Sequence, residues 1–499
     1  MRPFVENFPF FSIFLVMVTG ILLSVVRSGR LAMRISVVVA LVAAVLSAWV
    51  LAYTAGGNLS FTYVMGKYAA PLGNEIKAGP LQAILALTFC VGMAISLLGG
   101  SRDLERDVLP RKQNLYFVMS NLTLASLLAL TYTNDLFTGY VFIEISTIAA
   151  CALVMARDTG PNMIATIRYL FLSLMGSGLF LIGVAILYSI TGHLLMPQIH
   201  DKIRLLAATG QYALPLTVSV GLITVGLGVK SAMFPFHLWL PDAHGSATTA
   251  SSAILSGLVL KGYIVLMLTL MVRVFTLDLV LETQINDVLL VAGVLGMVMG
   301  SIRAIQQTHI KRMLAYSSVA QIGYIFMGFG LGTEVGAVAS CLHILVHACS
   351  KPMLFCCAGK LGDAAGHHKN LKNLRGSAYR SPLAGVGFTV GALSMIGIPL
   401  LGGFTSKLYF ASASLHTSDR TAIILLVLAV STVLNALYYV PAVLAIWSPG
   451  SEEKLASLPP MEPDWGFRVS TLVSIAAVFA LGILYDPAVD IIEAGISMM

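Results

Sequence analysis

Lysines stand in apolar surroundings at four places in this sequence. Lys230, Lys261, Lys351 and Lys407 lie inside or at the edge of long hydrophobic runs, although only 11% of all residues are charged. A charged side chain at membrane depth costs several kcal/mol, so such residues are rare and usually mark an ion or proton route. Glu144, near the middle of another apolar run, adds a buried acid. Together these five residues predict a membrane protein that moves charge.

Glu144 and Lys230 have the chemistry of a proton valve. Burial favours the neutral amine of a lysine and a nearby carboxylate favours the ammonium, so a change in their separation would switch Lys230 between holding and releasing a proton. Arginine would stay charged in this position. The two residues could equally form a static ion pair that holds helices together. Lys261, with Gly257 and Gly262 nearby, could be a further station on a hydrated path, or it could bind a neighbouring carbonyl or carboxylate.

His343, His347 and Lys351 recur every four residues and therefore share one face of a helix. Histidine can relay protons near neutral pH. These side chains could instead be hydrogen-bonded core residues. A metal site here would be short of ligands, because no Cys or carboxylate is placed to complete the pair of histidines.

Three more polar residues surround the segment WLPDAH, namely His237, Asp242 and His244. We expect them at the cytoplasmic entrance of the path. Loop histidines are often incidental, however, and Asp242 could instead cap the helix that follows.

The chain that must position these residues is predominantly apolar. Of its 499 residues 57% are hydrophobic, above the roughly 45 to 50% typical of soluble domains, and the mean hydropathy is +0.88. Runs of about 18 apolar residues, enough for a helix to cross a bilayer, recur along the whole chain. We predict an all-α polytopic membrane protein with about fourteen transmembrane helices, near residues 9–27, 32–54, 80–100, 114–132, 134–156, 164–191, 213–239, 246–272, 286–303, 310–331, 333–359, 381–411, 421–447 and 468–486.

The ends and connections of the chain give weaker signals. The first span lacks a basic leader and a small-residue cleavage site, so we expect a retained helix rather than a signal peptide. About a dozen residues follow the last span, so no C-terminal extension is expected. The longest polar stretches, near 55–79, 192–212 and 361–380, are predicted to be loops between helices.

Basic residues are distributed unevenly between the two sides of the membrane. The connections after odd-numbered spans, with their flanks, hold most of them, including Arg102, Arg106 and Lys311, and the other side holds about a third as many. Because basic loops stay in the cytoplasm, both termini should face outward. This pattern accounts for the net charge of +7 without a nucleic-acid partner.

A weak internal repeat relates two parts of the chain. Lys230 and Lys407 are 177 residues apart, and the same shift moves Glu144 onto Gln321. Units of five helices carrying matching polar residues would be inverted relative to each other, as in many transporters. The predicted division is 1–112 for helices 1 to 3, 113–275 for the first repeat (helices 4 to 8), 276–447 for the second (helices 9 to 13) and 448–499 for helix 14.

Helix breakers lie beside two of the lysines. Pro235 interrupts the run that contains Lys230, and Gly397, Pro399, Gly402 and Gly403 interrupt the run that contains Lys407. Freed backbone carbonyls at membrane depth are tolerated only against protein or a water-filled cavity. Helices 7 and 12 should therefore be discontinuous, with a wet pocket beside each lysine, although such breaks could also be kinks that serve packing.

Several motifs of redox and nucleotide chemistry are missing from the sequence. It contains no GxGxxG after a strand, no phosphate-binding GxxxxGK loop, no cysteine cluster and no haem-binding CxxCH. We therefore expect no catalytic residue, cofactor or metal ion in this chain, and we interpret its six cysteines as small packing residues.

Four sequence blocks carry a resemblance to a known family. They are GVKSAMFPFHLWLPDAHGSATTASSAILSGLVLKGYIVLM at 228–267, HIKRMLAYSSVAQIGYIFMG at 309–328, HILVHACSKPMLFCCAG at 343–359 and GIPLLGGFTSK at 397–407. In this order they resemble the antiporter-like proton-conducting subunits shared by respiratory complex I, membrane-bound nickel–iron (NiFe) hydrogenases and Mrp-type cation/proton antiporters. The resemblance covers nearly the whole chain. It implies fourteen helices, two inverted five-helix repeats and discontinuous helices 7 and 12.

The resemblance also implies roles for individual residues. Glu144 is similar to the family's helix 5 glutamate, Lys230 and Lys261 to its lysines on helices 7 and 8, and Lys407 to the exit-side group on helix 12, which is glutamate in some members of complex I. His347 and Lys351 resemble the polar residues of helix 11 on the central axis. The short C-terminus differs from the distal subunit with its long lateral helix.

A family member of this kind would be one proton-translocating module of a multi-subunit complex in a prokaryotic inner membrane. Its partners would be other membrane subunits, including further antiporter-like ones, which could carry iron–sulfur clusters, NiFe or flavin. A redox-driven proton pump is one expectation. Antiport of Na⁺ or K⁺ against H⁺ without redox chemistry is the alternative, and an assembly scaffold with an idle polar line is a third.

Overall fold

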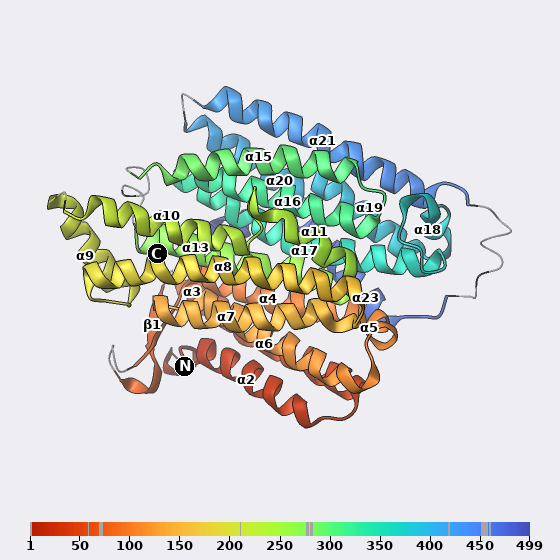
Figure 1. Ribbon diagram of the computed structural model, residues 1–499, viewed down its shortest axis with the longest axis horizontal. Coiled ribbons are helices and arrows are strands. Elements are labelled where there is room, and N and C mark those ends of the chain that lie inside the picture. Colours follow the sequence, from red (N-terminus) through yellow and green to blue (C-terminus); the bar gives the residue numbers. More distant parts are fainter. Residues whose placement is uncertain are drawn as a thin grey trace.

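Long apolar helices run side by side along the longest axis of the computed structural model (Figure 1). The structure describes residues 2–57, 59–68, 73–209, 211–275, 279, 283–417, 420–450, 458 and 461–499. Within these ranges twelve helical segments are long and apolar enough to cross a membrane. The two other predicted spans correspond to a 21-residue helix over Ile310–Gly330 and to a pair of shorter helices over Pro382–Ile396 and Gly402–Leu415. The prediction of an all-α polytopic membrane protein is confirmed.

The first part of the chain supplies the elements α1 (Arg2–Val5), α2 (Phe8–Leu22), η1 (Leu23–Val25), α3 (Gly29–Gly57), β1 (Phe61–Val64), η2 (Met65–Lys67), β2 (Glu75–Ala78), α4 (Pro80–Gly99), α5 (Ser101–Asp107), η3 (Pro110–Lys112), α6 (Gln113–Tyr132), α7 (Leu136–Val154), η4 (Met155–Arg157), α8 (Gly160–Thr191), α9 (Met196–Thr209), α10 (Ala213–Lys230), η5 (Phe236–Leu238), α11 (Trp239–Ser246), α12 (Thr249–Ile254), η6 (Leu255–Val259) and α13 (Leu260–Arg273).

The remainder supplies α15 (Ile285–Ile305), α16 (Ile310–Gly330), α17 (Glu334–Ala364), η7 (Leu371–Leu374), α18 (Ser377–Arg380), α19 (Pro382–Ile396), α20 (Gly402–Leu415), α21 (Thr421–Trp447), α23 (Trp465–Ile483) and α24 (Asp486–Ser497). The predicted division at residue 276 lies outside the described residues.

The predicted loops contain secondary structure, so that prediction was wrong in part. Within 55–79, β1 and β2 form an antiparallel hairpin that places Phe61 opposite Ala78. Within 192–212, α9 buries Met196, Ile199 and Ile203. These residues recur at helical spacing and give α9 an apolar face, a periodicity too short to appear as a span.

The centre of the bundle is the continuous segment α12–η6–α13. All of its membrane-length window is buried, and it packs against α17, α4 and α6. Its middle, Leu255–Val259, is a π-helical turn. Such turns are rare inside α-helices and are often found at functional sites.

Two helices are interrupted where the sequence predicts it. α10 ends at Lys230, and the chain continues through Pro235 into η5 and α11. α19 ends at Ile396 and is followed by Gly397, which has φ +95°, and α20 begins at Gly402. A left-handed residue closes the end of a helix most easily when it is glycine. A Cβ on Gly397 would also lie 2.8 Å from the Cδ of Lys407, so this glycine leaves room for the lysine.

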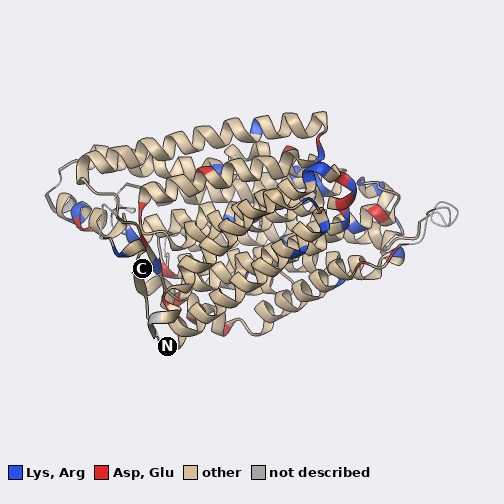
Figure 2. Cartoon of the chain, turned by 90° about the horizontal axis from the view of Figure 1, so that it is seen from below, with Lys and Arg blue, Asp and Glu red and all other residues tan. Residues whose placement is uncertain are grey.

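Both termini lie at the same end of the bundle (Figure 1). Lys77 of β2 donates hydrogen bonds to the carbonyl oxygens of Met498 and Met499 there. Figure 2 shows that lysine and arginine residues lie mainly at the opposite end. The structure therefore separates a basic end from the end that carries the termini.

Candidate functional site: a buried polar axis

Glu144 and Lys230 meet between α7 and α10. The Nζ of Lys230 lies 3.9 Å from the Oε1 of Glu144, and the lysine side chain is fully buried while that of the glutamate is 22% exposed. The same Nζ donates a 2.6 Å hydrogen bond to the hydroxyl of Thr147 and lies 5.4 Å from the centre of the Tyr263 ring. Glu144 Oε1 has no hydrogen-bond partner among the described residues. The ammonium is thus held more closely by a hydroxyl than by the carboxylate, and the ion pair is loose.

Lys261 follows directly on the π-helical turn. Its Nζ donates to the carbonyl oxygen of Ser256, five residues earlier in the same segment. The Ser256 hydroxyl in turn lies 2.8 Å from that of Ser318 on α16. The lysine therefore binds a carbonyl, as one of the predicted alternatives requires, but this carbonyl belongs to its own helix and ties no second helix to it.

Lys351 is surrounded by neutral oxygen atoms. Its Nζ donates to the carbonyl of Leu314 and to the hydroxyl of Ser317, each at 2.9 Å, and to the hydroxyl of Tyr439 at 3.3 Å. The Leu314 carbonyl also accepts a bond from Ser318. Because Ser318 contacts Ser256, hydrogen bonds connect Lys261 with Lys351.

The hydrogen bonds continue from Lys351 along α21. The Tyr438 hydroxyl lies 3.0 Å from the Ser317 hydroxyl and donates to the side-chain oxygen of Asn435 at 2.7 Å. The Asn435 amide reaches the Tyr324 hydroxyl at 3.4 Å. The Nζ of Lys407 lies 5.1 Å from the centre of the Tyr324 ring.

Lys407 occupies the break between α19 and α20. Its Nζ donates to the Ile396 carbonyl at 2.7 Å and to the Thr432 hydroxyl at 3.1 Å. The last carbonyls of a helix carry partial negative charge, so the end of α19 stabilises the ammonium. Lys230 likewise stands at the end of α10, immediately before a break.

His343 and His347 are fully buried on α17, the helix that also carries Lys351. His343 Nδ1 is 2.9 Å from the hydroxyl of Ser406, and its ring stacks on Tyr324 with 5.5 Å between centres. Neither ring nitrogen of His347 has a hydrogen-bond partner among the described residues. In the described ranges no group of three or more His, Cys, Asp or Glu side chains is arranged to hold a metal ion.

The three predicted entrance residues have different surroundings. Asp242 accepts bonds of 2.6 Å from both Arg168 and Arg312 and lines a surface cavity of about 490 Å³. It does not cap the following helix, because Thr248 supplies that cap by accepting from the Ser251 amide. His244 is fully buried and stacks on Phe355, and His237 is buried beside Phe234. Of these three residues, only Asp242 therefore lines this surface cavity.

Sequence reasoning missed most of the hydroxyl groups that connect the lysines. Ser317 and Tyr324 on α16, and Asn435, Tyr438 and Tyr439 on α21, are polar residues in apolar helices. Their spacings of three, four and seven residues place them on common helical faces. That spacing, in runs that are mostly apolar, is the signal that could have found them.

Comparisons with known proteins agree with this geometry. Residues 133–434, which include Glu144, the four lysines and the two histidines of α17, match the family model described as "NADH:quinone oxidoreductase/Mrp antiporter, TM". The chain is 33% identical over 435 residues to NADH-quinone oxidoreductase subunit N of Desulforudis audaxviator (strain MP104C), covering 85% of this chain and 84% of that protein. It is 27% identical over 489 residues to a Na(+)/H(+) antiporter subunit of Bacillus subtilis (strain 168), covering 97% and 96%.

Two solved structures have the same fold. A chain of the membrane-bound sulfane sulfur reductase (MBS), an archaeal respiratory membrane complex, matches with a TM-score of 0.83 and 26% identity, covering 99% of this chain and 96% of that one. A chain of the Mrp complex from Dietzia sp. DQ12-45-1b matches with a TM-score of 0.84 and 21% identity, covering 99% and 97%, a likeness of fold alone. With the family model matching more than half of its length, the chain belongs to the NADH:quinone oxidoreductase/Mrp antiporter transmembrane family.

Proposed function

We propose that this chain is a proton-translocating subunit of a multi-subunit energy-converting membrane complex. Protons would move along the buried axis formed by Glu144, Lys230, Lys261, His343, His347, Lys351 and Lys407. The observation that carries this proposal is that neutral oxygen atoms bind all four lysines.

Neutral partners matter because the charge of a lysine must be able to change. A buried ammonium that is locked to a carboxylate cannot lose its proton without leaving an unpaired charge, which is costly. Hydroxyl and carbonyl oxygens impose no such penalty. Among the described residues, Lys230 is the only one of the four lysines that lies near a carboxylate, and at 3.9 Å the contact is an ion pair without a hydrogen bond. The pair can therefore act as the valve that sets the protonation of the axis.

Hydrogen bonds supply the path between stations. Serine and tyrosine hydroxyls both donate and accept, so a proton can enter one side of a hydroxyl while another leaves it. Hydroxyls of this kind lie along the contacts from Lys261 to Tyr324. The backbone carbonyls of Ser256 and Leu314 also belong to this chain of contacts, and a water beside each would be needed to pass a proton. His347, fully buried four residues before Lys351, is a further relay beside it.

Partner subunits must supply the energy. Moving one charge across 100 mV is worth about 2.3 kcal/mol. In the proposed complex other membrane subunits, further antiporter-like ones among them, couple this cost to electron transfer through iron–sulfur clusters, NiFe or flavin that they carry themselves. The likeness to subunit N of NADH-quinone oxidoreductase supports this form.

Antiport of Na⁺ or K⁺ against H⁺ is the second candidate. It is favoured by the match to the Na(+)/H(+) antiporter subunit of Bacillus subtilis, which covers 97% of this chain. Purification of the native complex separates the two. Iron–sulfur absorbance together with proton uptake driven by an electron donor supports the redox pump, whereas a colourless complex that exchanges Na⁺ for H⁺ supports antiport.

The proposed orientation in a prokaryotic inner membrane follows from charge. The end rich in lysine and arginine in Figure 2 would face the cytoplasm, and the end with both termini would face outward. A tag at either terminus that is labelled by a membrane-impermeant reagent in intact cells supports this orientation, and labelling only after lysis rejects it.

We also propose that 113–275 and 276–447 are inverted repeats. Lys230 and Lys407 each lie beside a helix break, and both bind a threonine hydroxyl. If the two units superpose through a rotation about an axis in the membrane plane, the proposal holds; if they superpose without inversion, it is wrong.

Lys230→Met tests the proposed function directly. Methionine keeps the length and apolar stem of lysine but cannot carry a proton, so proton translocation should be lost while the complex still assembles. Lys202→Met, at an exposed position on α9, makes the same chemical change away from the axis and should leave proton translocation unchanged. Wild-type translocation by an assembled Lys230→Met complex would reject the assigned role.

A further inference from the structure

A second group of buried charges lies at the basic end of the bundle, where α5, α12, α16 and α17 meet. Asp103 on α5 is 8% exposed, and its Oδ2 accepts a hydrogen bond from the hydroxyl of Thr249, the first residue of α12. Gly359 on α17 makes room for this contact. A Cβ at that position would lie 2.5 Å from the Thr249 hydroxyl and 3.1 Å from Asp103 Oδ2.

The two oxygen atoms of the Asp103 carboxyl group face different surroundings. Oδ1 lies 3.0 Å from the guanidinium of Arg106, whose side chain is 41% exposed. Oδ2 points to Thr249, which is buried. The carboxyl group therefore connects the solvated end of the protein with the most buried helix of the bundle.

Lys311 completes this group from the first turn of α16. It is fully buried, and its Nζ donates a 2.7 Å bond to the carbonyl of Ala247, in the junction between α11 and α12. Among the described residues it has no ion-pair partner within 4.0 Å. The charges of Lys369, Asp103, Arg157 and Asp107 all act on it. Sequence reasoning counted Lys311 among the basic residues at the flanks of the connections and did not foresee that it is buried.

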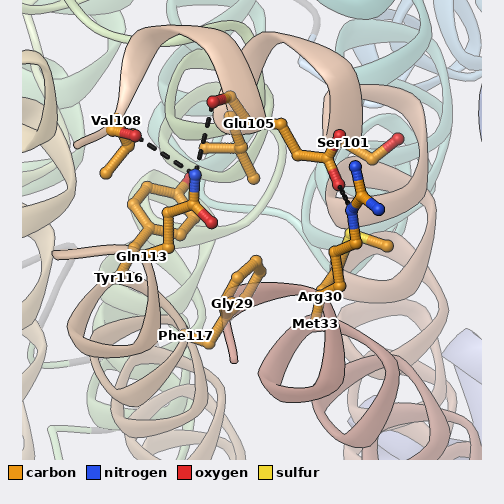
Figure 3. Close-up of a pocket in the computed structure, with 10 residues that line it drawn as sticks. Gly29, Arg30, Met33, Ser101, Glu105, Val108, Gln113, Tyr116 and Phe117 are labelled. Atoms are coloured by element: carbon orange, nitrogen blue, oxygen red, sulfur yellow. Dashed lines mark hydrogen bonds and ion pairs between the residues drawn. The ribbon is translucent and has the colours of Figure 1, made fainter. Parts of the chain in front are cut away.

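Contacts on the outer side of α5 hold this helix in place (Figure 3). Glu105 accepts a 2.7 Å bond from Arg30 at the start of α3. The side-chain amide of Gln113 donates to the carbonyls of Glu105 and Val108. The cavity below α5 measures about 10 Å³, roughly the space of one water molecule. The position of Asp103 is therefore set by surrounding contacts and does not depend on its own bond to Thr249.

Hydroxyl groups lead inward from this point. Thr249, Ser252 and Ser256 follow one another by three and four residues and so share one face of the segment. Ser252 bonds the carbonyl of His244, whose two ring nitrogens have no partner among the described residues. Ser256 provides the carbonyl that Lys261 binds.

We propose that Asp103, Thr249 and Lys311 form a proton-loading site that feeds Lys261 from the basic end of the protein. The inference rests on the proposed function and adds to it the place where protons enter. A proton from water adds to the Asp103 carboxylate and forms an O–H bond. The proton then passes inward through the Thr249 hydroxyl and, with water bridging the gaps between them, through the hydroxyls of Ser252 and Ser256. Each of these groups accepts one proton and gives up its own, and no electron changes place.

The surroundings of Asp103 raise the pKa of its carboxyl group above the ordinary value. Burial is the main cause and the charge of Asp363 adds to it, whereas the Thr249 hydroxyl, Arg106 and Lys311 act in the opposite direction. The charges around Lys311 are likewise mixed in sign. A carboxyl group serving only to hold Arg106 would need neither burial nor a hydroxyl partner on its inner side.

Asp103→Asn is the test, with Asp363→Asn as its matched control. Asparagine can still bind Arg106 and Thr249 but cannot take up a proton. Asp363 binds the same arginine at 2.8 Å, and no hydrogen bond among the described residues joins it to Thr249. In proteoliposomes containing the whole complex, Asp103→Asn should lower the rate of proton translocation about tenfold or more, whereas Asp363→Asn, which leaves the Asp103 carboxyl group in place, should lower it much less. Infrared difference spectra between low and high pH should lose a carboxylic-acid band in Asp103→Asn alone.

The outcomes separate this inference from the proposed function. If Lys230→Met abolishes translocation in the same assay while Asp103→Asn leaves it unchanged, the loading site is wrong and the axis stands. Equal losses in Asp103→Asn and Asp363→Asn would identify a structural charge cluster and also overturn the inference. If neither Lys230→Met nor Asp103→Asn has an effect, the proposed function itself fails.

Thr249 provides a second pair of variants in case Asp103→Asn prevents assembly. Thr249→Ser keeps the hydroxyl, and Thr249→Val keeps the shape without it. Slower translocation in the valine variant alone supports the loading site, and equal rates in the two variants overturn it.

Discussion

Glu144→Gln should uncouple the valve while leaving the helices packed. Glutamine has the size of glutamate and can still form hydrogen bonds, so it removes the charge and little else. The partner of that charge is the Nζ of Lys230 at 3.9 Å. Without the carboxylate, the buried ammonium loses its only anionic neighbour within ion-pair distance among the described residues.

The size of the effect follows from that distance. Two unit charges about 4 Å apart attract by about 4 kcal/mol at an effective dielectric constant of about 20. Because the Glu144 side chain is 22% exposed, we take about half of this energy as the lower bound. A range of about 2 to 4 kcal/mol corresponds to a loss of about 30-fold to 1000-fold in rate. It also matches the roughly 2.3 kcal/mol needed to move one charge across 100 mV.

The assay is proton translocation by the complex in proteoliposomes, followed with a pH-sensitive dye and normalised to assembled protein. Glu334→Gln, an exposed position in the first turn of α17, makes the same chemical change away from the axis and should leave the rate unchanged. An assembled Glu144→Gln complex that pumps within twofold of wild type would refute the idea that this pair controls the axis.

Three further expectations concern hydroxyl contacts, packing and pH. Tyr439→Phe removes a hydroxyl bound to Ser317 and Lys351, so the thermal midpoint should fall by the equivalent of about 1 kcal/mol and translocation should slow; an unchanged rate removes Tyr439 from the path. Gly359→Ala places a Cβ 2.5 Å from the Thr249 hydroxyl and should cost about 1 to 3 kcal/mol in thermal unfolding, and an unaltered midpoint would contradict the close packing. Burial, together with neighbouring positive charges, lowers the pKa of His309 to about 4, below the roughly 6.5 of an unfolded chain. Its stabilising effect is therefore complete above about pH 6.5 and is lost as the pH falls toward 4, so between pH 7 and pH 5 the midpoint should fall less in His309→Asn than in wild type.

Apolar run lengths and helix breakers were enough to predict most of the fold. Twelve of the predicted spans are recognisable as single apolar helices, and the interruptions after Lys230 and Gly397 lie where proline and glycine predict them. Both signals are local, so a single sequence reveals them. The β-hairpin and α9 were missed because short elements outside the membrane leave little trace in hydropathy.

The site was predictable in its charged residues and much less so in their connections. A lysine in an apolar run is conspicuous, whereas serine and tyrosine are common enough in membrane helices to pass unnoticed. That Lys351 binds Ser317 and Tyr439 depends on how α16, α17 and α21 pack, which no local pattern specifies. For the same reason the sequence did not reveal that the surrounding helices bury Lys311.

The π-helical turn at Leu255–Val259 lets the central segment hold one residue more than a regular α-helix following the same course. Each residue of an α-helix accounts for about 100° of rotation. If the turn became regular α-helix with all of its residues kept, every side chain after it would therefore turn by about that angle relative to those before it, and Lys261 would leave its present direction. Removing one of the five residues would instead give regular α-helix with Lys261 facing as it does now, so the direction of this lysine depends on the number of residues and on the shape of the turn together.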